Sequence, residues 1–85
     1  MKKIELYTTP FCGYCFAAKR LLTRKGVEYT EYNVAGDPSL RSEMFERSNG
    51  GRTVPQIFIE DRAIGGFEEM AELDADGELD QILAA

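Results

Sequence analysis

Both cysteines of the chain lie where a β-favouring stretch gives way to a helical one, and this junction restricts the fold more than any other feature. Residues 4–9 are rich in strand-forming side chains, and Pro10 ends that strand. A helical pattern of apolar residues begins at Gly13. Cys12 and Cys15 are separated by two residues, so if Cys12 caps the helix, Cys15 falls within its first turn. Their sulfurs can then come within bonding distance, which is the spacing of a redox pair.

A sulfur at the start of a helix meets backbone N–H groups that have no partner within the helix, and it meets the positive end of the helix dipole. Both favour the thiolate over the thiol. The more exposed cysteine is therefore expected to be the nucleophile. Cys12 precedes the helix, whereas Cys15 lies a turn further in and nearer the core, so the residues favour Cys12.

At 85 residues, the chain is expected to form one domain, residues 1–85, because it is too short for two independently folding cores. A core of this size leaves little room for a deep enclosed pocket. A substrate is therefore expected to bind in a surface groove beside the cysteines, which favours peptides or other proteins.

Charge is distributed unevenly along the chain. The net charge is −5; residues 1–62 hold all 10 basic residues and 8 acidic ones, whereas residues 63–85 hold 7 acidic residues. Because there is no basic run and no interleaved aromatic stripe, we expect no nucleic-acid binding. The acidic tail is either a solvated face that aids solubility or a surface that repels acidic partners.

The sequence contains no apolar stretch long enough for a secretion signal or a membrane span. We therefore expect no membrane association and a cytoplasmic location. Thiols stay reduced there, and a cysteine pair is more often catalytic or metal-binding than structural. A zinc site needs about four ligands, and the chain has two cysteines and no histidine. A zinc site is therefore not expected, and catalysis is favoured.

Hydrophobic periodicity and turn residues predict an α/β fold. A βαβ unit followed by a β-hairpin and terminal helices forms one mixed four-stranded sheet, in the order βαβαββα plus a short C-terminal helix, with helices on both faces. Open sheets of this kind place their sites at the carboxyl ends of strands, where Cys12 falls. The predicted strands span residues 4–9, 27–34, 56–59 and 62–64, and the predicted helices span 13–25, from 38 to before 49, from 67 to near 76, and 79–83.

Three motifs in this order resemble the glutaredoxin family of the thioredoxin fold. They are Cys12-Gly13-Tyr14-Cys15 at a helix start, Thr53-Val54-Pro55 before the third strand, and Gly65-Gly66 followed by an acidic residue. The similarity covers essentially the whole chain and is greatest to small bacterial dithiol glutaredoxins. It implies a monomeric glutathione-dependent thiol-disulfide oxidoreductase.

The resemblance also implies roles for the two cysteines. Cys12 would attack a protein disulfide or a glutathione mixed disulfide, and Cys15 would be the resolving thiol. Glutathione would serve as the reducing co-substrate, with no bound metal. The partners would be disulfide-containing or glutathionylated proteins, with ribonucleotide reductase as one candidate from the family.

The same resemblance supplies a set of glutathione-binding residues. Pro55 is expected to follow a cis peptide bond that turns the Val54 backbone toward the ligand, although on the residues alone it could simply start a strand. Glu68 would meet the amino group of glutathione, whereas Glu69 is equally well explained as an acidic residue in the first turn of a helix. The full set is Tyr14, Arg41, Thr53, Val54, Pro55, Gly66, Phe67 and Glu68.

Two positions depart from the family pattern and keep alternatives open. Thr9 stands where glutaredoxins commonly have a lysine, so the helix start must supply more of the activation of Cys12. Gly13 stands where the most familiar motif has proline. Some family members without that proline hold a [2Fe-2S] cluster between two protomers, through the first cysteine of each and two glutathione sulfurs, so Cys12 could be a cluster ligand. A second alternative is a redoxin that a flavoprotein reductase reduces.

Overall fold

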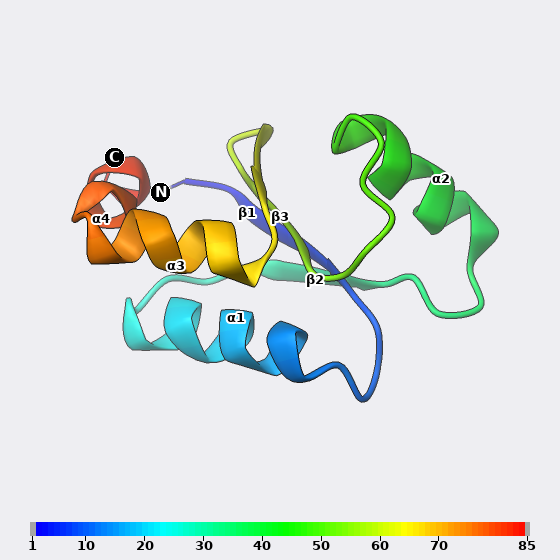
Figure 1. The fold of residues 1–85 in the computed structure, drawn as a ribbon, viewed down its shortest axis with the longest axis horizontal. Coiled ribbons are helices and arrows are strands. Elements are labelled where there is room, and N and C mark those ends of the chain that lie inside the picture. Colours follow the sequence, from blue (N-terminus) through cyan, green and yellow to red (C-terminus); the bar gives the residue numbers. More distant parts are fainter. Residues whose placement is uncertain (1, 85) are drawn as a thin grey trace.

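The computed structural model describes residues 2–84, and the strands and helices of this part of the chain follow the predicted order (Figure 1). The elements are β1 (Ile4–Thr8), α1 (Gly13–Arg24), β2 (Thr30–Asn33), α2 (Pro38–Arg47), β3 (Gln56–Ile59), β4 (Arg62–Gly65), α3 (Phe67–Ala75) and α4 (Glu78–Leu83).

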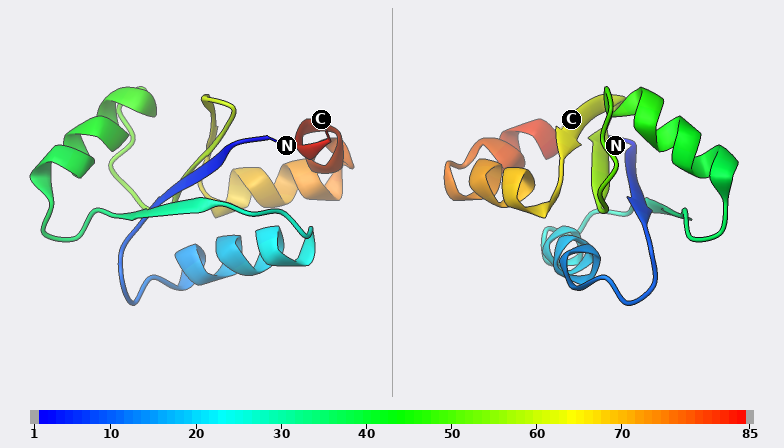
Figure 2. Two further views of the ribbon diagram at one scale, coloured as in Figure 1. Left: turned by 180° about the vertical axis from the view of Figure 1, so that it is seen from behind. Right: turned by 45° about the vertical axis from the view of Figure 1, so that its right-hand side comes forward.

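The strands form one mixed sheet with the spatial order β2-β1-β3-β4. β1 runs parallel to β2, whereas β3 runs antiparallel to both β1 and β4. Figure 2 shows α2 on one side of the sheet and α1, α3 and α4 on the other. The predicted mixed four-stranded sheet with helices on both faces is therefore confirmed.

Alternation of side chains along β1 and β3 divides the core into two parts. Leu6 and Ile57 point toward α1 and α3, whereas Tyr7 and Phe58 point toward α2. All four residues of β3 are buried, as predicted for a strand covered on both sides. The larger cluster contains Ile4, Leu6, Ala18, Leu21, Leu22, Ile57, Ile59, Met70 and Leu79. The smaller cluster contains Tyr7, Val34, Met44 and Phe58.

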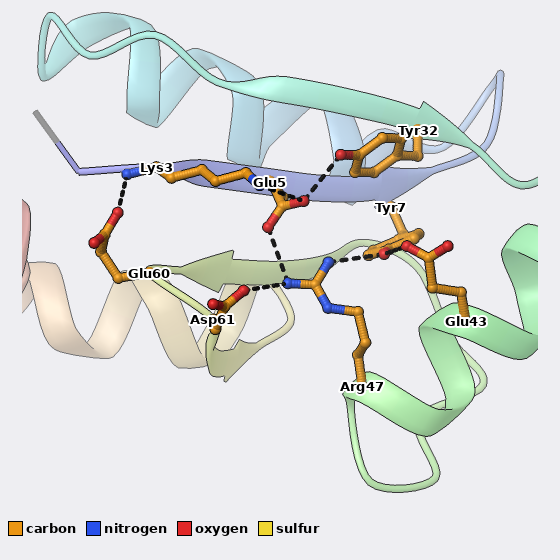
Figure 3. Close-up of polar contacts among 8 residues, drawn as sticks. All are labelled: Lys3, Glu5, Tyr7, Tyr32, Glu43, Arg47, Glu60 and Asp61. Atoms are coloured by element: carbon orange, nitrogen blue, oxygen red, sulfur yellow. Dashed lines mark hydrogen bonds and ion pairs between the residues drawn. The ribbon is translucent and has the colours of Figure 1, made fainter.

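A polar network fastens α2 to its face of the sheet (Figure 3). The Glu5 carboxylate on β1, in a residue only 4% exposed, accepts hydrogen bonds from the Arg47 guanidinium at 2.9 Å and from the Tyr32 hydroxyl at 2.9 Å. Arg47 also donates to the Tyr7 hydroxyl at 2.8 Å, and that hydroxyl in turn donates to Glu43. The network thus joins β1, β2 and α2.

These contacts set the protonation of the buried groups. Burial acts to raise the pKa of Glu5, but the hydrogen bonds from Arg47 and Tyr32 outweigh it and hold that pKa below its ordinary value. Burial, followed by the hydrogen bond to Glu43, raises the pKa of Tyr7 to about 12. At neutral pH a charged carboxylate therefore pairs with a charged guanidinium. Among residues 2–84, every buried side-chain nitrogen or oxygen has a hydrogen-bond partner.

The second strand is shorter than predicted, because the chain first completes the end of α1. Gly26 has the predicted left-handed conformation, with φ of +74°. Its N–H donates to the Thr23 carbonyl at 3.0 Å, and the N–H of Val27 donates to the Leu22 carbonyl at 3.3 Å. This is a Schellman motif, which uses the Val27 N–H for the helix. Val27 is thereby kept out of the sheet ladder, which starts at Thr30.

One lysine links α1 to the acidic C-terminal segment. The Lys25 ammonium lies 2.6 Å from a carboxylate oxygen of Asp74 on α3 and 2.8 Å from one of Asp80 on α4. Both acidic residues belong to the tail that carries the negative charge of the chain. The lysine thereby neutralises part of that charge where α3 and α4 meet the end of α1.

Candidate active site

Cys12 caps the first helix, as predicted. Its backbone is extended, with φ of −103° and ψ of 111°, and its sulfur accepts a hydrogen bond from the Cys15 N–H at 3.2 Å. The sulfur thereby pairs with one N–H group of the first turn that has no partner within the helix. Because α1 follows the carboxyl end of β1, the sulfur lies at that edge of the sheet.

The two thiols occupy different environments. Cys12 is half-buried, whereas Cys15 lies on the core side of α1 and is 1% exposed. Burial, followed by the hydrogen bond with Cys12, raises the pKa of Cys15 to about 11. Cys12 is therefore the sulfur that a substrate can reach, and Cys15 is a protonated thiol behind it.

The segment before β3 approaches the Cys12 sulfur. The Val54–Pro55 peptide bond is cis, as the resemblance implied. The Cys12 thiol donates to the Val54 carbonyl oxygen at 3.8 Å. Pro55 is buried, while Val54 is partly exposed. The backbone of Val54 therefore lies beside the sulfur and within reach of a bound molecule.

A groove of about 310 Å³ opens beside these residues. The rings of Tyr14 and Phe67 stack across it, with their centroids 6.4 Å apart and their planes at 29°. The groove brings together seven of the eight residues that the sequence predicted for glutathione binding. The lining consists of Tyr14, Thr53, Val54, Pro55, Gly66, Phe67, Glu68 and Glu69.

The two acidic residues at the start of α3 have different surroundings. A carboxylate oxygen of Glu69 accepts a hydrogen bond from the Gly66 N–H at 2.7 Å, which caps the helix. The preceding Gly65 has φ of +109°, which favours glycine, and a side chain there would meet Glu69. Glu69 thus has a structural role, and the exposed Glu68 is the acidic side chain that can meet a ligand.

A smaller cavity, of about 120 Å³, is lined by both cysteines and by a lysine that the sequence interpretation missed. Lys19 lines it together with Cys12 and Cys15. Its ammonium lies 3.0 Å from Glu31, which also accepts a hydrogen bond from Thr8 at 2.7 Å. These contacts lower the pKa of Glu31, chiefly through Thr8. Lys19 lies four residues after Cys15 on the same helix, and this spacing in the sequence could have indicated that the two side chains share a helix face.

Arg41 is the one predicted binding residue outside the groove. It is exposed on α2 and lines a separate hollow of about 480 Å³, together with Phe45 and Arg52. Its assignment to the glycine carboxylate of glutathione stays a prediction.

Comparison with known families identifies the chain. The glutaredoxin family model matches residues 4–64, which run from β1 to β4 and include both cysteines and the Val54–Pro55 bond. The chain belongs to the glutaredoxin family. Membership implies a glutathione-dependent thiol oxidoreductase, and the adjacent Cys12 and Cys15 are consistent with a redox-active centre.

Individual relatives of this glutaredoxin support the same conclusion. Glutaredoxin 3 of Escherichia coli strain K12 is 47% identical over 83 residues, which cover 98% of this chain and 99% of the relative. A crystal structure of a buckwheat glutaredoxin–glutathione complex has a TM-score of 0.86 at 27% identity, and the match covers 96% of this chain and 76% of that one. The solution structure of glutaredoxin from Brucella melitensis has a TM-score of 0.82 at 44% identity, covering 95% and 87%. The fold is therefore thioredoxin-like.

Two further features of this glutaredoxin concern metals and membranes. Within residues 2–84, no three His, Cys, Asp or Glu side chains are grouped so as to hold a metal ion. The helices in the described part of the chain are all too short or too polar to cross a bilayer.

Proposed function

We propose that this glutaredoxin is a dithiol enzyme that reduces protein disulfides and glutathione mixed disulfides, with glutathione as its reducing co-substrate. One observation carries the proposal. The reachable Cys12 sulfur lies between the Val54 carbonyl and the helix N-terminus, whereas the Cys15 thiol is buried behind it. The Cys12 sulfur can thus exchange with a substrate disulfide, and the Cys15 thiol can then resolve the mixed disulfide that forms on Cys12.

With a glutathione mixed disulfide, the reaction needs Cys12 alone. The Cys12 thiolate attacks the glutathione sulfur, and the protein sulfur leaves as a thiolate that takes up a proton. A second glutathione thiolate then attacks the glutathione sulfur bound to Cys12. Glutathione disulfide forms, and Cys12 leaves as a thiolate that the Cys15 N–H stabilises at 3.2 Å.

With a protein disulfide, the reaction also needs Cys15. The Cys12 thiolate attacks one sulfur of the substrate and forms a mixed disulfide, while the other substrate sulfur leaves and is protonated. Cys15 then loses its proton and attacks the Cys12 sulfur, which releases the reduced protein. The resulting Cys12–Cys15 disulfide is reduced by two molecules of glutathione, which become glutathione disulfide.

The groove offers groups that match each part of glutathione. The Val54 N–H and C=O can pair with the extended tripeptide as an added strand does. Tyr14 and Phe67 supply apolar contact, and Glu68 supplies a negative charge for the amino group. The buckwheat protein was solved as a glutathione complex, and that likeness supports the same ligand here. We assign Arg41 to the far carboxylate of glutathione, and Thr53, Pro55 and Gly66 to the walls of the groove.

Cellular context follows from the same assignment. We propose a cytoplasmic monomer whose substrates are disulfide-containing or glutathionylated proteins, ribonucleotide reductase among the candidates. A reducing compartment keeps the pair in its dithiol form.

A turnover assay on a glutathione mixed disulfide, with Cys12→Ser and Cys15→Ser variants, tests the proposal. The Cys12 variant should be inactive and the Cys15 variant should retain deglutathionylation but lose protein disulfide reduction. Equal loss in both variants would refute the assignment of roles. A brown, dimeric, glutathione-dependent protein purified without oxygen would point to cluster carriage. Reduction by a flavoprotein reductase but not by glutathione would indicate the other redoxin class.

A further inference from the structure

Phe11, the residue before the nucleophile, has two unusual features. Its side chain is 98% exposed. Its backbone is left-handed, with φ of +64°, a conformation that aromatic residues rarely adopt. Neither feature helps the fold, because the ring packs on nothing and the backbone is strained. Such an outlier beside a reactive group is a reason to look for a role in function.

Two exposed aromatic side chains follow Cys12 in the sequence: Tyr14, 60% exposed, lines the groove, and Phe16 lies outside it. Phe16 is 57% exposed, and its N–H donates to the Cys12 carbonyl at 3.1 Å. It lines the small cavity together with Cys12 and Pro10. We call Phe11 and Phe16 the aromatic pair. Neither residue lines the groove assigned to glutathione.

The chemistry of the proposed function brings a polypeptide to this place. In a mixed disulfide the Cα atoms of the two cysteines lie about 4.4–6.8 Å apart. The substrate backbone must therefore pass close to Cys12, and the residues beside its cysteine must contact the surface around Cys12. The groove proposed for glutathione is lined by Tyr14 and Phe67 instead.

The charge around the aromatic pair favours an apolar contact. The Lys19 ammonium lies 4.8 Å from the centroid of the Phe16 ring, and it is already paired with Glu31 at 3.0 Å. Because the charges of Lys19 and Glu31 offset each other, this surface has little net charge with which to select a charged partner. Of the aromatic side chains near Cys12 in the sequence, Phe11 is the most exposed, at 98%, and it offers an arriving chain the largest free apolar surface.

We propose that the aromatic pair, Phe11 above all, docks disulfide-bearing polypeptides that carry an apolar side chain next to the reacting cysteine. This inference rests on the proposed function and adds a determinant of substrate choice. It separates the two reactions, because protein disulfides would use Phe11 and small glutathione mixed disulfides would not.

The test compares two synthetic peptides, each with one internal disulfide, that differ only in leucine or serine beside the cysteine. Pre-reduced protein is mixed with each peptide and single-turnover reduction is followed, so that no glutathione is needed. At limiting peptide, Phe11→Ala should lower the rate constant for the leucine peptide about tenfold. Docking on the leucine side chain would bury roughly half of the Phe11 ring and leave the rest in water, and the loss of that burial corresponds to a change of this size. The serine peptide should change less than twofold by the same reasoning.

Controls separate docking from damage to the site. Phe45 on α2 is also exposed, at 41%, and its replacement by alanine should change neither rate. Phe11→Asn should behave as Phe11→Ala, because asparagine tolerates the left-handed backbone but offers no apolar ring. Turnover of a glutathione mixed disulfide with a small thiol should be unchanged in both Phe11 variants.

Several results would overturn the inference. They are an unchanged rate for the leucine peptide, an equal loss for both peptides, or a matching loss with the small mixed disulfide. A dimer in sedimentation that Phe11→Ala dissociates would assign the ring to self-association instead. Failure of wild-type turnover with glutathione, alongside a Phe11 effect on the peptides, would refute the proposed function and leave the docking site standing.

Discussion

Replacing Arg47 by methionine should destabilise the protein far more than replacing any exposed arginine. Arg47 is the hydrogen-bond donor shared by Glu5, at 2.9 Å, and Tyr7, at 2.8 Å. Its guanidinium carbon lies 4.2 Å from the centroid of the Phe58 ring. Methionine keeps a similar apolar stem, so the variant tests the charge and its hydrogen bonds.

The magnitude follows from the burial of the partner. Glu5 is 4% exposed, and without Arg47 its charge would retain the Tyr32 hydroxyl as a donor. Breaking a buried ion pair costs about 3–5 kcal/mol. Because the Arg47 side chain is 23% exposed, water can replace part of the interaction, and we expect the lower end, about 3 kcal/mol. For a domain of this size that lowers Tm by about 12–24 °C.

The loss should depend on pH in a defined direction. In the wild type the pKa of Glu5 lies below its ordinary value of 4.5, so its stabilisation is present above that pH and is lost as the pH falls through the folded-state pKa. Without Arg47, burial raises the pKa of Glu5 instead. The variant can then neutralise Glu5 in mildly acidic solution, so the difference from wild type should be largest at neutral pH and should narrow toward pH 4.

Urea unfolding followed by far-ultraviolet circular dichroism, at neutral and acidic pH, measures both effects. Arg52→Met is the matched control, because Arg52 is exposed and its guanidinium carbon only lies over the Phe45 ring at 5.3 Å. It should cost less than about 1 kcal/mol. A loss in Arg47→Met no greater than in Arg52→Met, or one that does not change with pH, would refute the reasoning.

Three further predictions concern α2 and the redox pair. Asp37→Ala should lower the free energy of unfolding by about 1 kcal/mol in urea unfolding, because the carboxylate accepts the Leu40 N–H at 3.1 Å as the N-cap of α2, and Asp37→Ser should restore most of it. Met44→Ala should cost about 2–5 kcal/mol by thermal unfolding, since that side chain is 1% exposed, and Met44→Leu should cost less than about 1.5 kcal/mol. Alkylation of the reduced protein at neutral pH, mapped by mass spectrometry, should label Cys12 first, and Cys15 should react readily only as the pH approaches about 11; equal labelling at neutral pH would contradict the assigned burial.

Local patterns were enough to predict the order of elements and most of the groove. Alternating and helical periods place side chains on faces, and the glycine and proline positions mark where elements end. The family motifs then supplied Val54, Gly66 and Glu68, which the fold brings to one groove.

What the patterns missed depends on contacts between distant segments. Periodicity places Glu5 on the side of the sheet away from Leu6, but it does not identify Arg47, 42 residues later, as its partner. Likewise, the sequence shows that Thr9 stands where the family commonly has a lysine, but it does not show whether another lysine lies near the cysteines. Only the position of α1 beside β2 shows that Lys19 pairs with Glu31 and lines a cavity with both cysteines. The start of β2 was misplaced because the end of α1 competes with the sheet for the Val27 N–H. Residue propensities do not describe such a competition between hydrogen bonds.

Val54 contacts both the smaller core cluster and the Cys12 thiol, and it can therefore couple these two parts of the molecule. Its side chain packs against the smaller core cluster beneath α2, while its carbonyl oxygen contacts the Cys12 thiol. A molecule that holds the Val54 backbone should therefore also make the local opening of α2 less favourable, and thermodynamic linkage then requires that a more stable α2 tightens the binding of that molecule by the same factor. The amide hydrogens of α2, on the face of the sheet opposite α1, would then report the occupancy of the groove beside Cys12.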